Sequence, residues 1–327
     1  MDDSVNADKR PDRRGRQYES SPHVNVAVDS GKERKPARAE RVKDFAYRKT
    51  PDKFKNASGL QIRFRTGVVY VVLCLICILA SDATTVLFLS ATAGICAGEF
   101  YYMLRSDAKM PNEWIGVVGA VLYPPSVFFF GLDGAVGVTV LLLVSLTLWY
   151  VFWMRARVQD VGVCFFGAVY TGLQLSGLVL IRTALPDPWG GVALLVVFLS
   201  LWGNDAFAYL FGSRFGRHKL APRTSPNKSW EGFAAGLLSS MLIWCLMLLV
   251  PGVSITVYQA LLFGLVCGLA GVLGDLCESR IKRSVGFKDS GTIMPGHGGL
   301  FDRCDSLMTT AVAASVLLIG AGCITLV

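Results

Sequence analysis

Long apolar runs separated by short charged segments fill the chain from residue 66 to residue 327. A helix needs about 20 predominantly apolar residues to cross the hydrocarbon core of a bilayer, and nine runs approach that length. The pattern therefore predicts an all-α, polytopic membrane protein with about nine transmembrane helices. The predicted spans are 66–81, 83–104, 114–131, 134–154, 161–184, 188–212, 230–250, 256–276 and 305–326.

The first 65 residues have a different composition. They contain 17 Lys and Arg residues against 10 Asp and Glu residues, whereas the rest of the chain contains 15 against 14. Polar segments of this kind do not bury enough apolar surface to fold. We therefore predict a disordered basic tail over residues 1–65 and a transmembrane domain over residues 66–327. Because no folded domain carries the positive charge, we expect the tail to meet anionic lipid head groups and not nucleic acid.

The charges of the loops indicate an orientation, because positively charged loops stay on the cytoplasmic side of a membrane. With a cytoplasmic N-terminus, the loops 105–113, 155–160, 213–229 and 277–304 lie inside. These loops contain fourteen Lys and Arg residues, whereas the opposite loops contain at most Arg182. The asymmetry predicts nine spans with the N-terminus in the cytoplasm.

Two predicted spans contain carboxylates, which are expensive at membrane depth and usually face a polar cavity. Asn204 and Asp205 lie in the sixth span, and Asp275 lies in the eighth. The two longest cytoplasmic loops follow these two spans. If the eighth helix continues past the membrane edge, one face of it presents polar residues at helical spacing. These residues are Asp275, Glu278, Ser279, Lys282 and Arg283.

The loop before the last span is rich in glycine and charge. Lys288-Asp289 is followed by a turn with three glycines in four positions, Gly296 to Gly299, where backbone N–H groups can approach an anion closely. Asp302 and Asp305 are three residues apart and can point the same way. Hard oxygen ligands in this number suit Mg²⁺. Zinc is disfavoured, because His297 has no helical His partner and no Cys pair lies nearby.

Two features leave alternatives open. The loop 213–229 contains several cations and serines, among them Ser225 and Lys228, but any one of its cations is equally well explained by the positive-inside rule. Glu99 lies in the second predicted span without an evident partner. It either supports the fold or lines the polar cavity.

These motifs together resemble one enzyme family, the phosphatidate cytidylyltransferases, also called CDP-diacylglycerol synthases. The resemblance is strong over about residues 200–306 and only topological before them. Met294 and Cys304 depart from the pattern, at positions where the family has branched or aromatic apolar residues. The matching residues are Asn204-Asp205, Tyr209, Ser225-Pro226, Lys228, Trp230-Glu231-Gly232, Gly274-Asp275-Leu276, Glu278, Ser279 to Arg283, Lys288-Asp289, His297-Gly298-Gly299, Asp302-Arg303 and Asp305.

The resemblance implies that CTP and phosphatidate react to give CDP-diacylglycerol and pyrophosphate, with Mg²⁺ and an active site that faces the cytoplasm. A second cation is left open, and so is the oligomeric state, with a homodimer as one arrangement. The predicted catalytic residues are Asp275, Lys282, Arg283, Asp302 and Asp305. The predicted metal ligands are Asp275, Asp302 and Asp305, with Asp289 as a weaker candidate. The predicted substrate-binding residues are Asn204, Asp205, Ser225, Lys228, Ser279, Lys288, His297, Gly298, Gly299 and Arg303.

An ion-coupled membrane transporter is the alternative interpretation, because buried carboxylates and broken helices also mark ion pathways. Transporters often contain internal repeats, and the first half of the chain contains no counterpart of residues 275–305. A CDP-alcohol phosphotransferase is disfavoured, because the single Asp-Gly pair, Asp133-Gly134, lacks the Arg that follows in that family's motif.

Overall fold

The computed structural model describes residues 59–105, 112–221, 225–295 and 298–325. The predicted tail falls almost wholly on residues 1–58, which lie outside the described residues. The elements are α3 (Gly59–Ala80), α4 (Asp82–Arg105), α5 (Glu113–Phe152), α6 (Val158–Ala168), the π-helix η1 (Val169–Leu173), α7 (Gln174–Thr183), α8 (Trp189–Phe215), β1 (Lys219–Ala221), β2 (Ser225–Ser229), α9 (Trp230–Trp244), the 3-10 helix η2 (Cys245–Leu249), α10 (Val257–Ser284) and α11 (Phe301–Gly320).

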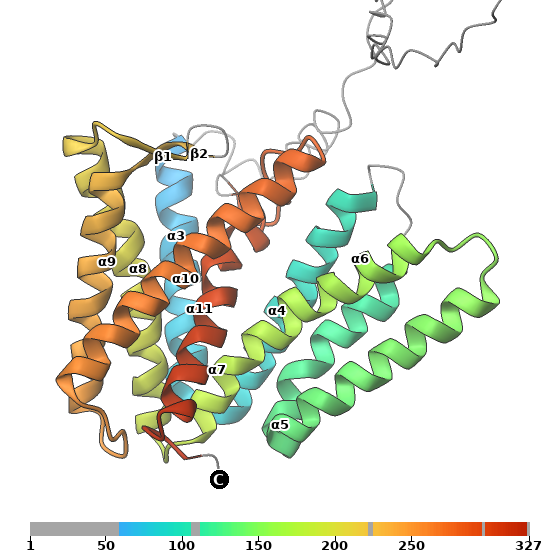
Figure 1. Ribbon diagram of the computed structural model, residues 1–327, viewed down its shortest axis with the longest axis horizontal. Helices are drawn as coiled ribbons and strands as arrows, with labels where there is room; N and C mark the ends of the chain where they lie inside the picture. Colours follow the sequence, from blue (N-terminus) through green and yellow to red (C-terminus); the bar gives the residue numbers. More distant parts are fainter. Residues whose placement is uncertain (1–58, 106–111, 222–224, 296–297, 326–327) are drawn as a thin grey trace, which may run out of the picture.

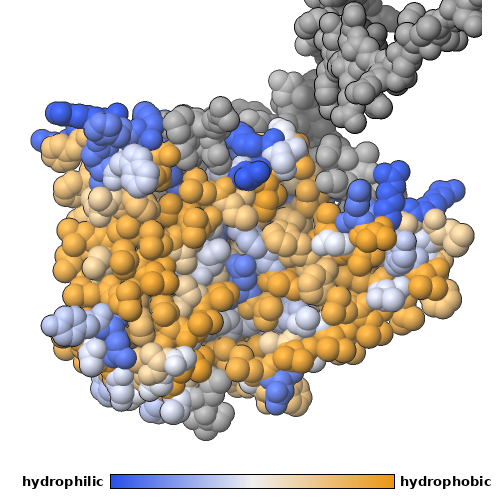
Figure 2. Space-filling view, viewed as in Figure 1, coloured by the Kyte–Doolittle hydropathy of each residue, from blue (hydrophilic) through white to orange (hydrophobic). Residues whose placement is uncertain are grey.

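The described part of the chain contains seven helical segments that are long and apolar enough to cross a membrane, preceded by the shorter apolar stretch Phe64–Ala80. Figure 2 shows apolar side chains over the middle of one face, whereas hydrophilic side chains gather at its ends. The architecture is that of a polytopic helical membrane protein, as the apolar runs predict. Within the described ranges, the short antiparallel hairpin β1-β2 is the departure from the all-α prediction.

The long element α5 consists of two antiparallel helices joined at Gly131. This residue has φ 57° and ψ −139°, a conformation that only glycine adopts readily. Tyr123 Oη lies 2.9 Å from Thr139 Oγ1 across the two arms, and Leu142 packs against Gly119. The arms therefore fold back on each other, as Figure 1 shows. They correspond to the two spans predicted over 114–131 and 134–154.

Helices α8, α9, α10 and α11 form the part of the bundle that contains most of the predicted site residues. α9 packs along α8 and α10, and α11 packs along α10 and α7 (Figure 1). Glycines lie at these contacts: a Cβ on Gly264 would be 2.6 Å from Met241 Cα, and a Cβ on Gly236 would be 2.7 Å from Asn204 O. Small residues let helix backbones approach closely, which is a main source of helix association in lipid.

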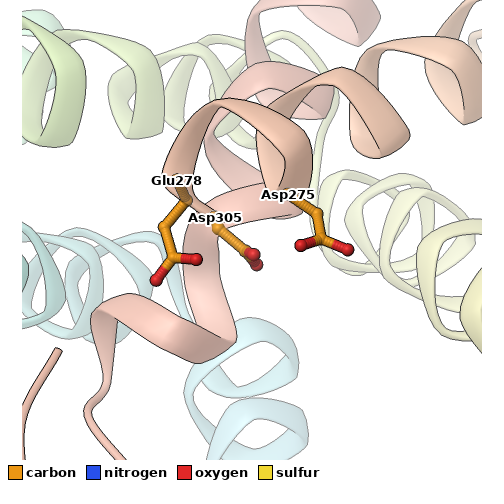
Figure 3. A group of neighbouring side chains, drawn as sticks. All are labelled: Asp275, Glu278 and Asp305. Carbon is orange, nitrogen blue, oxygen red and sulfur yellow. The ribbon is translucent and has the colours of Figure 1, made fainter. Parts of the chain in front are cut away.

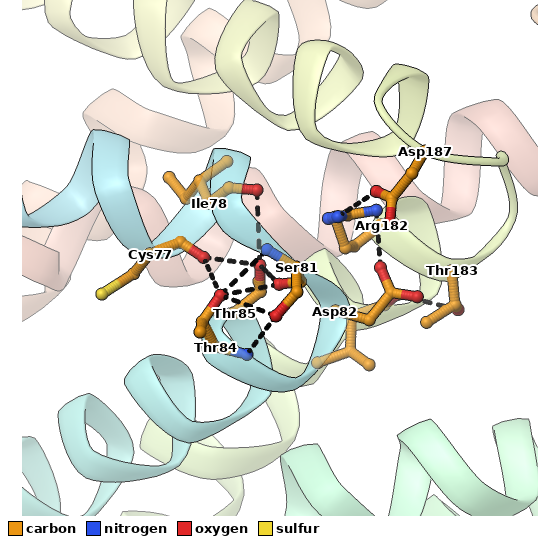
Figure 4. A network of polar contacts seen from close by, with 10 residues as sticks. Cys77, Ile78, Ser81, Asp82, Thr84, Thr85, Arg182, Thr183 and Asp187 are labelled. Carbon is orange, nitrogen blue, oxygen red and sulfur yellow. Dashed lines mark hydrogen bonds and ion pairs between the residues drawn. The ribbon is translucent and has the colours of Figure 1, made fainter.

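The two ends of the bundle differ in charge. The β1-β2 hairpin and the C-terminal end of α10 lie at one end, and the α3–α4 and α7–α8 connections lie at the other (Figure 1). Arg182 lies at this second end with 1% of its side chain exposed, and it forms ion pairs with Asp82, at 2.5 Å, and with Asp187. Figure 4 shows these pairs beside the α3–α4 turn, where the Thr84 hydroxyl donates to Cys77 O at 2.9 Å. The cation is thus neutralised, and it ties α7 to the start of α4.

Candidate active site

The site is built where α10 crosses α11. α10 continues eight residues beyond the predicted span end at 276 and finishes at Ser284, so the polar face predicted from Asp275 onward is helical. Gly274 makes the crossing close, because a Cβ there would lie 2.5 Å from Asp305 O and 2.3 Å from Thr309 Oγ1. The last two predicted spans, α10 and α11, therefore pack directly against each other. This packing brings Asp305 beside the polar face of α10.

Three carboxylates meet at this crossing. Asp275, Glu278 and Asp305 each offer one oxygen, and these oxygens all lie within 4.8 Å of one another (Figure 3). Glu278 and Asp305 are buried, whereas Asp275 is half-buried. Sequence reasoning placed Glu278 on the face of Asp275 but gave it no role as a ligand. The signal was available, because Asp275 and Glu278 are one helical turn apart.

Lys282 neutralises part of this charge. Its Nζ lies 2.6 Å from Glu278 Oε2 and 2.8 Å from Asp302 Oδ1, and only 13% of its side chain is exposed. The partners of this ammonium group are thus two carboxylates of the protein, where the sequence suggested substrate phosphates. A buried carboxylate next to lipid would be very unfavourable without such a partner, so Lys282 makes the acidic cluster tolerable.

Asp302 is not one of the three grouped carboxylates but lies beside Glu278, and most of its hydrogen-bond donors come from the loop. Its oxygens accept hydrogen bonds from the backbone N–H groups of Ser290, at 3.0 and 3.1 Å, and Gly299, at 2.8 Å, in addition to Lys282. Four short contacts to protein donors leave this carboxylate well satisfied. Asp289, the other candidate ligand in this loop, is exposed and lies outside the cluster.

The glycine turn closes around Asp302. Gly298 has φ +91°, and a Cβ on it would lie 2.5 Å from Asp302 Oδ2. Met294 N donates to Gly298 O at 3.0 Å and closes the turn. The N–H group of Gly299 donates to Asp302 and so is already used within the protein. Phosphate binding by the other N–H groups of the turn stays a prediction. Gly296 and His297 lie outside the described residues.

Glu99 joins the N-terminal half of the chain to this loop. Its carboxylate accepts hydrogen bonds from Ser290 Oγ at 3.0 Å, Leu300 N at 3.1 Å and Phe301 N at 2.8 Å. The question that the sequence left open is thereby answered: Glu99 is buried and holds the start of α11. No local pattern could reveal this, because its partners lie about 200 residues further along the chain.

A cavity of about 540 Å³ with both polar and apolar lining adjoins the cluster, between α8, α9 and the β1-β2 hairpin. Lys228 lines it and forms an ion pair with Asp275, which connects the cavity to the carboxylates. Asp205, also in the lining, interacts electrostatically with Asp275, Lys228 and Arg303. The lining residues are Asn204, Asp205, Ala208, Tyr209, Gly212, Ser213, Gly216, Lys219, Leu220, Asn227, Lys228, Ser229, Gly232, Phe233 and Val272.

The remaining predicted residues divide between the cluster and the surface. The Ser279 hydroxyl donates to Asp275 Oδ1 at 3.2 Å and fixes that side chain. Arg283, Lys288 and Arg303 are exposed at the same end of the bundle. The backbone of Ser225 lies in β2, and its side chain is outside the described part of the chain. The structure thus brings together carboxylates, a cavity lined in part by charged side chains, and cations.

The donor set fits a hard divalent cation. Mg²⁺ is held by a few carboxylate oxygens and keeps further positions for water or substrate phosphates. Three carboxylates from two helices meet the first requirement, and the half-exposed Asp275 beside the cavity leaves an open side for the second.

Comparison with known proteins gives the family. Residues 61–319 match the cytidylyltransferase family. The chain belongs to this family. Among its relatives are proteins named phosphatidate cytidylyltransferase from Staphylococcus saprophyticus, 38% identical, Staphylococcus epidermidis, 39% identical, and Staphylococcus aureus, 40% identical. Each match covers 165 residues, half of this chain and 62% of the relative. The family match extends well before residue 200, where the sequence motifs alone gave only a topological likeness.

Substitutions of Lys282 and its neighbour Arg283 test whether the ion pairs of Lys282 stabilise the protein. We expect Lys282→Met to destabilise the protein by roughly 3–5 kcal/mol, because it leaves Glu278 as a buried carboxylate without its partner. The matched control is Arg283→Met, which removes the same charge from an exposed position and is expected to change the melting temperature little. Thermal unfolding in detergent measures both. Equal melting temperatures for the two variants would show that the Lys282 ion pairs do not hold this crossing together.

Proposed function

We propose that this protein transfers the cytidylyl group of CTP to phosphatidate, giving CDP-diacylglycerol and pyrophosphate. The observation that carries the proposal is the group of three carboxylates beside a cavity at the cation-rich end of a membrane bundle. Membership of the cytidylyltransferase family supports the nucleotide, and the names of the relatives support the lipid. In the described part of the chain, no feature favours the transporter alternative.

The chemistry requires little acid–base help from the protein. A phosphate oxygen of phosphatidate attacks the α-phosphorus of CTP, and the bond from that phosphorus to the bridging oxygen of the β-phosphate breaks. Pyrophosphate leaves with the electron pair. The attacking group is a phosphate monoester whose second pKa is about 6, so it is largely ionised near neutral pH. Catalysis then depends on positioning and on neutralising the charge of two anionic substrates.

We assign the metal to the three-carboxylate cluster. Mg²⁺ would be held by oxygens of Asp275, Glu278 and Asp305, and when bound it would neutralise charge on the substrate phosphates. This assignment keeps two of the three ligands suggested by the sequence and substitutes Glu278 for Asp302. The hydrogen bonds of Asp302 to Ser290, Gly299 and Lys282 support the substitution. A second cation stays a hypothesis, because the described residues contain one group of three such carboxylates, which is assigned to Mg²⁺.

The protein's cations and its cavity would orient the substrates. Asn204, Asp205 and Lys228 line the cavity, which is large enough for a nucleotide's base or sugar. The exposed cations Arg283, Lys288 and Arg303 surround the same end and would neutralise phosphates by direct contact. The phosphatidate head group lies at the membrane surface, where this end of the bundle would emerge.

We further propose nine spans with a cytoplasmic N-terminus. Counting the two arms of α5 separately and α3 as a short span gives this number within the described residues. The orientation rests on the positive-inside rule, and it would place the site where CTP is made available. The α5 turn, the α7–α8 connection and the α9–α10 connection would then face the opposite side.

An assay with position-labelled CTP tests the function. With CTP labelled in its α-phosphate, purified protein, phosphatidate and Mg²⁺ are expected to convert the label into extractable lipid. With CTP labelled in its γ-phosphate, the label is expected to stay in water as pyrophosphate. Asp305→Asn is expected to lower turnover at least about a hundredfold, the scale for losing an electrostatic contact to the transition state. The control Asp133→Asn, exposed in the α5 turn, is expected to keep wild-type turnover.

Two results of that assay would contradict the proposal. Lipid labelled from the γ-phosphate would indicate a kinase. If folded protein produces no labelled lipid from either α-labelled or γ-labelled CTP, the proposed cytidylyl transfer is wrong.

Single cysteines placed along the chain test the orientation. In a variant without reactive native cysteines, an impermeant thiol reagent added outside is expected to label positions 133, 187 and 252, but not positions 217 and 288. The first three lie in the connections that would face outward, and the last two lie at the cation-rich end. Labelling of position 288 from outside would contradict the proposed orientation and would show that the site does not face the cytoplasm.

A further inference from the structure

We propose that Glu99 is a positioning residue for the metal ligands: its carboxylate holds the start of α11 and so sets the place of Asp305. The inference concerns the cation site of the proposed function and rests on it. Glu99 belongs to α4, in the half of the chain that lies outside the sequence motifs of the site. It contacts neither the cavity nor the three-carboxylate cluster.

The start of α11 needs an acceptor from elsewhere in the chain. The first N–H groups of a helix have no partner within the helix, and such groups are costly to bury away from water. The cap residue of α11, Leu300, has no side chain that could accept a hydrogen bond. Glu99 Oε1 and Oε2 accept from Leu300 N and Phe301 N at 3.1 and 2.8 Å. A negative charge at this position is also favoured by the helix dipole.

Two glycines leave room for the Glu99 carboxylate. A Cβ on Gly299 would lie 2.3 Å from Glu99 Oε2 and 2.0 Å from Ser290 Oγ, and a Cβ on Gly291 would lie 2.3 Å from Glu99 Oε1. All three distances are too short for a real side chain. These glycines therefore bring the loop backbone onto a carboxylate of the protein, in addition to any contact that the turn makes with substrate.

A continuous series of polar contacts runs from Glu99 to the cluster. Ser290 donates its hydroxyl to Glu99 at 3.0 Å and its N–H to Asp302 at 3.0 Å. Asp302 accepts from Lys282 at 2.8 Å, and Lys282 pairs with Glu278 at 2.6 Å. Loss of the Glu99 carboxylate would loosen the loop and the first turn of α11 together. Asp305, in the next turn of that helix, would then lose its fixed distance from Asp275 and Glu278.

Direct binding of Mn²⁺ to purified protein without nucleotide or phosphatidate tests the inference, because it does not depend on turnover. We expect Glu99→Gln to weaken Mn²⁺ binding by roughly 10-fold to 100-fold, the range seen when groups that orient metal ligands are removed. The amide keeps the shape but turns one acceptor oxygen into a donor facing backbone N–H groups. Glu99→Asp keeps the charge and is expected to recover part of the affinity. The matched control is Glu113→Gln, which removes an ion pair with the exposed Arg105 far from the cluster in sequence and is expected to bind Mn²⁺ normally.

The outcomes separate positioning from mere stability. Glu99→Gln protein with a lower melting temperature but wild-type Mn²⁺ affinity would overturn the inference. If Glu99→Gln does not fold, Glu99→Asp decides, because it keeps the charge but draws the carboxylate one methylene away from Leu300 N and Phe301 N. A weaker Mn²⁺ affinity in that variant supports the inference, and an unchanged affinity overturns it. Wild-type protein that binds Mn²⁺ but forms no CDP-diacylglycerol would refute the proposed function while leaving the positioning role of Glu99 standing.

Discussion

The ammonium group of Lys282 lies between two carboxylates where α10 crosses α11, and the rest of the site depends on that arrangement. Glu278 contributes one carboxylate from α10, and Asp302 contributes the other from the first turn of α11. A carboxylate with 1% of its side chain exposed, such as Glu278, needs an opposite charge close by. The pairing therefore fixes the spacing of the two helices, and with it the distance between Asp275 and Asp305.

The same ion pair divides the acidic residues into two groups with different surroundings. Asp302 accepts hydrogen bonds from Lys282, Ser290 N and Gly299 N and organises the glycine turn. Asp275 and Asp305, with Glu278, have fewer donors and meet where the cavity begins. A divalent cation can compete for carboxylates of the second group more easily than for those of the first. Glu99 extends the organising group into α4, so that both halves of the chain support one site.

Much of this arrangement could be predicted from sequence because it follows local periodicity. Apolar runs of sufficient length gave the helices, and the i, i+3, i+4 spacing gave the polar face of α10. The sequence also predicts a polar surrounding for Asn204 and Asp205, since polar residues in a span need one, and in the structure both line one cavity with Lys228. The roles of Glu278, Asp302 and Glu99 could not be separated in this way. Each depends on contacts between helices that are distant in sequence, and local patterns do not determine which acid a given lysine or N–H group reaches.

The β1-β2 hairpin was not predicted from the sequence, because its strands are short and rich in lysine and serine.

Anomalous diffraction from crystals of the protein soaked with Mn²⁺ tests the central claim most directly. The account predicts a manganese peak within bonding distance of oxygens from Asp275, Glu278 and Asp305, with Lys282 still between Glu278 and Asp302 and Glu99 still bound to the start of α11. A peak coordinated by Asp302 or Asp289, with the three-carboxylate cluster free of metal, would contradict it.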